Sequence, residues 1–422
     1  MAQEPDGTRT TVAPRGVPTV ASSSRARFRI ASLAGRMAAA ATRISRIGRP
    51  ELRGQVMLRV DPDSVIRLLH RQPWVLVIGQ YGTTVLAGLL LAAVRAAHGT
   101  EEPRLVQATA SDGVDGLVAV LADRSAPDLA VVGARPGDAA DLLAAGALPE
   151  AVVLFSTSGA APAERYAQAR RLRDALGRLP VPVIAGVDDP ISVLAAGSAR
   201  RQVWVRGEAG YGDQLLCPGC GSILVGVGGR GWRCPRRDYV EPEPDYLVQD
   251  GKITDAGGQV WDPRLRLPGR LGVDQACFAL AAAESLEINA GTVFVGMRNL
   301  EDALGRFRTV RIGDSSARLL AARHPAEFED ALAVIDKPTV IIATDESDVG
   351  WVWDCDPAPL AGRTVITTGE RAPDVAVRLS HAGLACRTVP DLAGALAGHR
   401  RGADVVATPA AFRALLRLGE RP

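Results

Sequence analysis

Residues Val75–Gly99 read VLVIGQYGTTVLAGLLLAAVRAAHG. The apolar run Val75–Ile78 predicts a buried strand, the segment Gly79–Thr84 a glycine turn, and the apolar stretch after it a helix. This order is typical of a loop that holds a phosphate, because backbone N–H groups at a helix N-terminus face the anion. Such a loop normally has lysine directly before its Ser or Thr, and this chain has Thr83 there. The predicted binding residues are Gly79, Gly82, Thr83 and Thr84.

Composition limits the classes of protein to consider. A chain of 422 residues is too long for one ordinary core, so we expect two or three domains. A formal net charge of +2 argues against a nucleic-acid partner. Lysine occurs only at Lys252 and Lys337, so no nearby lysine can replace the missing one in the loop.

The cysteines and the apolar runs indicate in which cellular compartment the protein is expected. Six cysteines are too sparse for a disulfide framework, and the polar N-terminus is unlike a secretion signal. The longest apolar run, Val85–Val94, is too short to span a membrane. We therefore expect a soluble cytoplasmic protein with no membrane span.

The chain divides into successive regions. Residues 1–25 predict a disordered tail and residues 26–55 a helical lead-in with interspersed arginines. The lead-in has two interpretations: an amphipathic helix at a membrane surface, or, as we prefer, a helix packed on the first domain. From residue 56, helices alternate with short apolar runs, which predicts a parallel sheet with helices on both faces. The predicted strands are Val56–Val60, Val75–Ile78, Leu129–Val132, Val152–Phe155 and Val181–Gly186.

A second, smaller α/β unit of Rossmann-like type is predicted over residues 316–422. We place its boundary with the central domain, residues 56–315, between Gly313 and Arg318. Its predicted strands are Val340–Thr344, Thr364–Thr367, Cys386–Val389 and Val405–Ala407. Helices are predicted at Glu327–Ile335, Ala372–Ala382, Leu392–Leu396 and Pro409–Leu416.

A cysteine ribbon is predicted as an insertion in the central domain, at about residues 205–262. Cys217-Pro-Gly-Cys220 places two thiolates on a tight turn that suits one zinc ion, and Cys234 begins a second such turn. Arg237 stands where a fourth cysteine would complete the site. Two alternatives stay open: Asp238 supplies the fourth ligand, or the hairpin persists without metal.

These motifs, taken together in chain order, resemble the Mur ligase family, and within it the MurT-type subunits of lipid II isoglutaminyl synthase. The turn-like motifs among them are individually unspecific, whereas the cysteine ribbon together with the Trp-x-Trp-Asp and Gly-Glu-Arg motifs of the C-terminal unit is the specific part of the resemblance. In the central domain they are Leu58–Pro62, Gly79–Thr84, Glu164–Tyr166, Val187–Pro190, the cysteine ribbon, Leu267–Arg270 and Gly305–Phe307. In the C-terminal unit they are His324-Pro325, Gly350–Asp354 and Thr368–Ala372.

The resemblance implies a two-protein complex. A ligase subunit uses ATP and Mg²⁺ to activate the α-carboxylate of D-glutamate in a lipid-linked peptidoglycan precursor, forming an acyl phosphate. A GatD-like glutamine amidotransferase supplies the ammonia that converts it to D-isoglutamine. It further implies that an Asp of the C-terminal unit orients the histidine of the partner's Cys–His pair. Asp348, which we favour, and Asp354 are the candidates.

The sequence departs from the family pattern at several positions of one pocket. Thr83 replaces the lysine, Ala134-Arg135 follows a strand where the family has a magnesium-binding acid, and His324 replaces an asparagine. Further asparagines are missing before Asp188-Asp189 and after Arg270. Thr83 and Thr84 still offer hydroxyls, and Arg270 or Arg306 could supply positive charge. Three interpretations therefore stay open: an active amidating ligase, an ATP-incompetent scaffold or regulator of a GatD-like glutaminase, and a ligase repurposed for another carboxylate.

Overall fold

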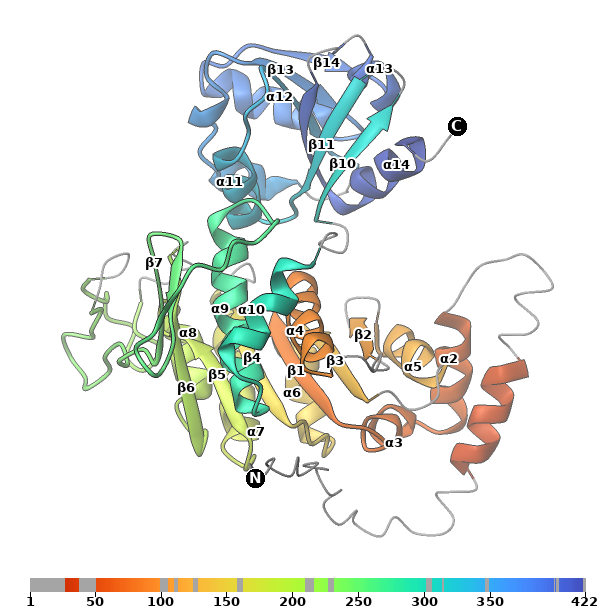
Figure 1. The fold of residues 1–422 in the computed structure, drawn as a ribbon, viewed down its shortest axis with the longest axis vertical. Helices are drawn as coiled ribbons and strands as arrows, with labels where there is room; N and C mark the ends of the chain where they lie inside the picture. The colour runs from red at the N-terminus through yellow and green to blue at the C-terminus, as the bar shows by residue number, and fades with distance from the viewer. Residues whose placement is uncertain are drawn as a thin grey trace, which may run out of the picture.

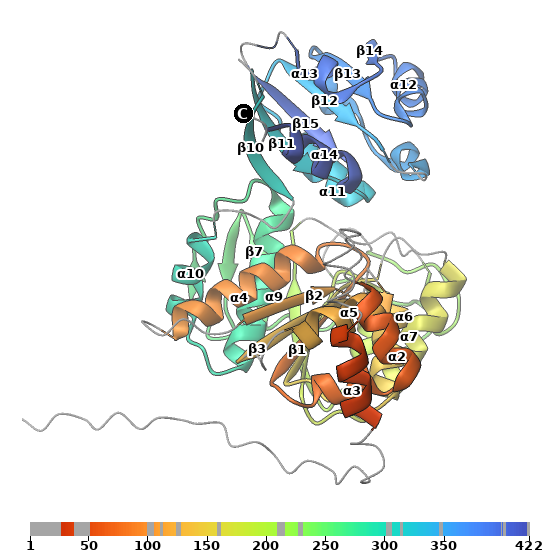
Figure 2. The same cartoon turned by 90° about the vertical axis from the view of Figure 1, so that its right-hand side faces the viewer.

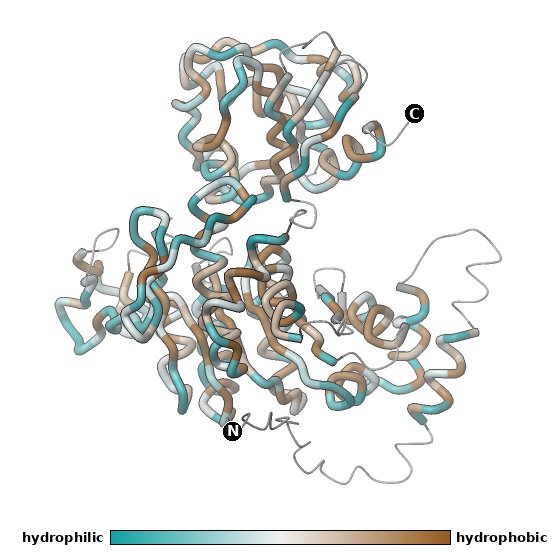
Figure 3. Tube along the Cα trace, viewed as in Figure 1, coloured by the Kyte–Doolittle hydropathy of each residue, from teal (hydrophilic) through white to brown (hydrophobic). Residues whose placement is uncertain are grey.

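The computed structural model contains two α/β units, one above the other in Figure 1. It describes residues 27–37, 51–98, 105–109, 113–123, 128–157, 162–208, 216–226, 231–300, 306–312, 315–345, 349–397, 399 and 402–419. The predicted fold class is confirmed, since each unit is a largely parallel sheet between helices. Figure 3 shows the hydrophobic segments gathered in both sheets.

The central unit is built on a nine-stranded sheet of order β2-β3-β1-β4-β5-β6-β7-β8-β9. The strands from β2 to β7 are parallel, and β8 and β9 extend the edge as antiparallel neighbours. Their bounds are β1 Trp74–Gly79, β2 Leu105–Thr109, β3 Leu129–Ala134, β4 Ala151–Ser156, β5 Pro182–Gly186, β6 Arg201–Arg206, β7 Tyr246–Gln249, β8 Lys252–Thr254 and β9 Val260–Trp261.

Alternating side chains of β1 enter two different cores. Val75 and Val77 face one side and Leu76 and Ile78 the other, which is why the run is apolar throughout. The first side is covered by α4 (Thr83–Ala97), α9 (Arg270–Ser285) and α10 (Ala290–Arg298). The second is covered by α2 (Glu51–Val60), α3 (Ser64–Leu69), α5 (Gly113–Asp123), α6 (Pro136–Ala144), α7 (Pro162–Leu176) and α8 (Pro190–Ala196).

The predicted strand at Val56–Val60 is wrong, because these residues form the second half of α2. Only one side of the segment is buried: Met57 enters the core, whereas Val60 is exposed. Gly54 lies against the backbone of Asp115 in α5, where a β-carbon would be 1.8 Å from the carbonyl oxygen. A five-residue apolar run cannot by itself distinguish a strand from one side of a helix.

The C-terminal unit is built on a six-stranded sheet of order β10-β11-β15-β12-β13-β14, in which only β10 is antiparallel to its neighbour. Its strands are β10 Phe307–Ile312, β11 Ser315–Ala321, β12 Thr339–Ala343, β13 Thr364–Thr368, β14 Cys386–Val389 and β15 Ala403–Ala407. Helices α11 (Pro325–Ala333) and α12 (Ala372–His381) cover one face, and α13 (Leu392–Leu396) and α14 (Pro409–Gly419) the other. The boundary predicted between Gly313 and Arg318 falls in the β10–β11 hairpin, so residues 307–312 belong to this sheet.

The two units meet where the carboxyl end of β1 faces α11 and α14. Figure 2 shows these two helices on the side of the C-terminal unit that faces the central unit, and α11 contacts α9. Across the described residues, no helix is long and apolar enough to cross a membrane.

Candidate functional site at the interface of the two units

The loop between β1 and α4 is held by close packing. Gly82 caps α4 with φ = 76°, a conformation that favours glycine. A β-carbon there would lie 2.6 Å from both Gln275 Nε2 and Phe155 Cε1. The amide of Gln275 also donates a hydrogen bond to the Gly82 carbonyl oxygen, at 3.2 Å. The predicted glycine turn is therefore present, and α9 fixes it from a distant part of the chain.

The first turn of α4 offers hydroxyls and backbone N–H groups but no acidic residue. Thr83, which replaces the lysine, is buried, and Thr84 lines a cavity of about 200 Å³ between the two units. The Gln107 amide donates to the Thr84 carbonyl oxygen at 2.8 Å. Because Gly82 and Thr84 at the start of α4 line this cavity, the positive end of the helix dipole points toward it.

Three arginines line the same cavity: Arg306 before β10, Arg323 before α11, and Arg413 on α14. The acidic residue among the lining residues is Glu327, whose carboxylate is 3.5 Å from Arg306 Nη1 and 3.8 Å from Arg323 Nε. Burial opposes ionisation of Glu327, but these two guanidinium groups lower its pKa. Among the described residues that line the cavity, three positive charges and one negative charge leave a formal charge of +2, which suits an anion at the α4 N-terminus.

Arg270, the other arginine predicted to supply positive charge, is not among the described residues that line this cavity, whereas Arg306 is. Arg270 is exposed on the first turn of α9, and the N–H of the next residue, Leu271, donates to Asp330 of α11 at 3.1 Å. Gly269 permits this approach, because a β-carbon there would lie 2.2 Å from the Asp330 carboxylate. Burial raises the pKa of Asp330.

The magnesium-binding acid of the family pattern has no counterpart at the end of β3. That strand ends at Ala134, and Arg135 occupies the N-cap position of α6 without a side-chain capping hydrogen bond. The acidic pair Asp188-Asp189 has structural partners instead. Asp189 caps α8 through the Ile191 N–H at 3.0 Å, and Asp188 accepts from the Gly207 N–H at 2.7 Å. Burial raises the pKa of Asp188 to about 7.

The three candidate zinc ligands come together as predicted. The sulfur atoms of Cys217, Cys220 and Cys234 all lie within 4.8 Å of one another. Isolated bridges Leu216–Ile223 and Val225–Arg233 support their turns, and hydrogen bonds with Ser222 lower the pKa of Cys220 to about 6. Asp238, exposed, does not join this group, and the Arg237 guanidinium, a cation, cannot ligate a metal. The cluster fits a metal with three thiolate ligands and an open fourth position.

One of the two candidate acids of the C-terminal unit can be placed. Asp354 is exposed at the end of a 3₁₀ helix, η2 (Gly350–Asp354), whereas Asp348 lies outside the described residues. Trp351 packs on Phe328, with ring centroids 5.6 Å apart. Trp353 is 49% exposed beside His381 and Arg378 of α12.

Comparisons with known proteins give the same architecture. The chain superposes on the MurF ligase of Thermotoga maritima, solved in complex with ADP, with a TM-score of 0.59, 14% identity, and coverage of 87% of this chain and 83% of that one. A pseudomurein peptide ligase type C from Methanothermus fervidus gives a TM-score of 0.58 and 14% identity, with 82% and 78% covered. This chain has the Mur ligase fold.

Two further comparisons complete this result. The folylpolyglutamate synthase of Thermotoga maritima shares the Mur ligase fold of this chain, with a TM-score of 0.55, 13% identity, and 85% and 93% covered. Residues 322–402 match the family model of the MurT ligase C-terminal domain. No curated protein matches the sequence.

Three residues at the loop of this Mur ligase fold could not be singled out from the sequence. Arg323 and Arg413 line the cavity beside the loop, yet they lie in the C-terminal unit, far along the chain and in no local motif of their own. Tyr81 is buried, and its ring centroid is 4.3 Å from that of His324, but in the sequence it is only one member of the glycine turn. No local signal could have found these residues, because their partners are set by the packing of the two units.

Proposed function

We propose that the chain is the ligase-type subunit of a carboxylate-amidating complex and binds the phosphates of ATP at the interface of its two units. The observation that carries this proposal is the convergence of Arg306, Arg323 and Arg413 on the N-terminus of α4. A guanidinium group can donate two parallel hydrogen bonds to phosphate oxygens, and it remains charged at all physiological pH values. They supply the positive charge that the loop itself lacks at Thr83.

The proposed reaction has two steps, phosphorylation of the carboxylate and its amidation. A carboxylate oxygen of the acceptor attacks the γ-phosphorus of ATP, and the bond to the leaving oxygen of ADP breaks, which gives an acyl phosphate. Ammonia then attacks the acyl carbon and displaces phosphate, which leaves the amide. Charge spreads over the oxygens of the transferring group, so cations placed around it lower the barrier. The Thr84 hydroxyl would be this chain's ligand to a magnesium ion that accompanies the nucleotide.

The test is nucleotide binding, measured by calorimetric titration of the purified chain with ATP and magnesium. Arg413→Gln is expected to weaken binding by about tenfold, the effect of losing one charge-assisted contact. Arg417→Gln is the matched control, because Arg417 lies one turn further along α14 and is not among the described residues that line the cavity. Absence of binding at millimolar ATP, or equal affinities of both variants, would contradict the proposal.

A second candidate function is that of an ATP-incompetent scaffold or regulator of a glutaminase. It is favoured by Thr83 at the lysine position and by Ala134-Arg135 after β3, where the family pattern has an acid. A scaffold would bind its partner but would show no nucleotide binding in the titration above. The same experiment therefore separates the two candidates.

The partner in both cases is proposed to be a GatD-like glutamine amidotransferase of the cytoplasm. Support comes from the family match over residues 322–402 and from the exposed Trp353 and Asp354 beside α12. The acceptor is proposed to be the D-glutamate α-carboxylate of a lipid-linked peptidoglycan precursor. Another carboxylate would indicate a repurposed ligase.

Substitution tests the proposed role of the acids. Asp354→Asn or Asp348→Asn should lower the glutaminase activity of the co-purified partner at least tenfold if that residue orients the catalytic histidine. Asp374→Asn is the control, since Asp374 is a surface residue of the same unit paired with Arg371. If neither substitution changes glutamine hydrolysis, this assignment is wrong.

A further inference from the structure

The helix over residues 27–37 has an apolar row on each of two opposite sides. On one side Ala31 is fully buried, and Gly35 lies so close to α2 that a β-carbon would be 2.6 Å from Met57 Cγ. On the other side Ile30, Leu33 and Met37 are 60%, 61% and 67% exposed. Their spacing of three and four residues places them on one face. The helix is therefore anchored on the central unit, and within the described part of the chain its outward apolar face is exposed.

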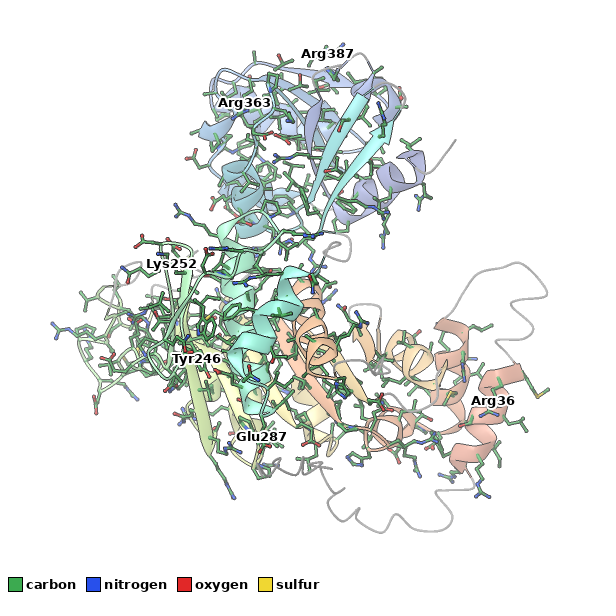
Figure 4. The ribbon with its side chains drawn as sticks, in the orientation of Figure 1. Arg36, Tyr246, Lys252, Glu287, Arg363 and Arg387 are labelled. Carbon is green, nitrogen blue, oxygen red and sulfur yellow. The ribbon has the colours of Figure 1, made fainter. Side chains whose placement is uncertain are left out.

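Arginines border this outward face. Arg27, Arg29 and Arg36 are all exposed. Arg29 and Arg36, seven residues apart, share one border of the face, and Arg27 lies on the other. Figure 4 labels Arg36 on this helix, at the outer edge of the central unit.

The charge of the surrounding sequence has one sign. Residues 7–50 contain nine arginines and neither aspartate nor glutamate, although the whole chain has a net charge of only +2. Positive charge is thus concentrated around a helix whose outward face is apolar. Such a combination complements a surface that is anionic at its boundary and apolar just beneath it.

We propose that this helix attaches the protein to the surface of an anionic membrane. Ile30, Leu33 and Met37 enter the boundary between headgroups and acyl chains, and the arginines remain at the level of the lipid phosphates. An eleven-residue helix is about 16 Å long, so it lies in the plane of the surface. A nucleic acid would satisfy the arginines but would offer the apolar face nothing.

This inference does not depend on the proposed ligase activity, because it stands on the helix alone. A chain without nucleotide binding would carry the same outward face. If the proposed acceptor is correct, the attachment would bring the central unit to the surface where a lipid-linked substrate resides.

Vesicle flotation of the full-length chain tests the proposal. Binding is expected to vesicles of phosphatidylcholine and phosphatidylglycerol, to weaken as salt is raised, and to be at least tenfold weaker for phosphatidylcholine alone. The triple substitution Ile30→Ser, Leu33→Ser and Met37→Ser should reduce binding to the mixed vesicles at least tenfold. Arg29→Gln together with Arg36→Gln should reduce it about 25-fold, at about fivefold for each charge.

A matched control removes exposed apolar side chains elsewhere. Ile223→Ser, Val260→Ser and Val295→Ser change three exposed residues outside this helix and should leave vesicle binding unchanged. Unaltered far-ultraviolet circular dichroism and melting temperature show that each variant is folded. Failure to bind the mixed vesicles, or full binding by the serine triple variant, would overturn the proposal. Retention of a short DNA duplex by both the parent chain and that variant, without vesicle binding, would assign the arginines to nucleic acid instead.

Discussion

The ring of Tyr81 in the glycine loop stacks on the ring of His324 in the C-terminal unit, with centroids 4.3 Å apart and planes 22° from parallel. Tyr81 is 1% exposed and also meets the edge of Phe155, at 6.0 Å. His324 caps α11 in addition, because its Nδ1 accepts from the Ala326 N–H at 3.3 Å. The loop of one unit and a helix start of the other are thus joined through one aromatic pair.

Substitution of His324 should separate the two roles of this side chain. His324→Ala removes both stack and cap and is expected to lower the free energy of unfolding by about 1–3 kcal/mol. His324→Asn keeps a good capping residue and removes only the ring, so its cost should be about 0.5–1.5 kcal/mol. Denaturant unfolding measures both, and equal costs for the two variants would show that the cap contributes nothing beyond the stack.

Gly82→Ala should be one of the more damaging single substitutions in the chain. Its φ of 76° strains any other residue, and the new β-carbon would meet Gln275 and Phe155 at 2.6 Å. We expect a loss of about 2–4 kcal/mol in unfolding free energy. Gly146→Ala provides the control: its φ is 91°, but no atom lies within 4 Å of the added carbon. A control variant as unstable as Gly82→Ala would assign the whole effect to backbone strain.

The buried Asp188 should make stability depend on pH. Burial raises its pKa to about 7, and the nearby Asp274 and Glu241 act in the same direction. The folded chain therefore holds this proton more tightly than the unfolded chain, whose aspartates titrate near pH ~4. The contribution to stability is fully present below about pH 4 and is lost as pH rises through 7.

Asp188→Asn should remove this component. Between about pH 5 and pH 8 the parent chain is expected to lose roughly 1–3 kcal/mol from this group, and the variant correspondingly less. Thermal unfolding across this pH range measures the difference between the two slopes. Asp63→Asn is the control: it changes an exposed aspartate, so the stability of this variant should depend on pH as steeply as that of the parent chain. Parallel curves for the parent chain and Asp188→Asn would contradict the prediction.

The cysteine cluster should bind one thiophilic divalent ion per chain. Cobalt(II) titration of the reduced protein is expected to give thiolate charge-transfer absorption that saturates at one equivalent, since three sulfur atoms lie within 4.8 Å of one another. Cys234→Ser should abolish this absorption. Cys386→Ser is the control and should not affect it, because Cys386 lies on β14 in the other unit. Cobalt absorption that survives Cys234→Ser would exclude this site.

Local features of the sequence determined much of the fold. The run Val75–Ile78 and the glycines after it predict a strand, a turn and a helix, because all the atoms involved are neighbours in the chain. The cysteine turn is predictable for the same reason, since Cys217 and Cys220 sit on one tight turn. Strands β12 to β15 and helices α11 to α14 of the C-terminal unit are likewise predicted to within a few residues, whereas β10 and β11 are not.

Only the tertiary structure decided how the site is charged and closed. Arg323 and Arg413 reach the glycine loop because the β-sheet of the C-terminal unit sets α11 and α14 against it. Val56–Val60 is helical because α2 packs one of its sides against α5, a contact that a five-residue pattern cannot predict. The sequence motifs predict where the loop lies. Long-range packing places the arginines beside it, because side chains distant in the sequence meet only after the sheets have formed.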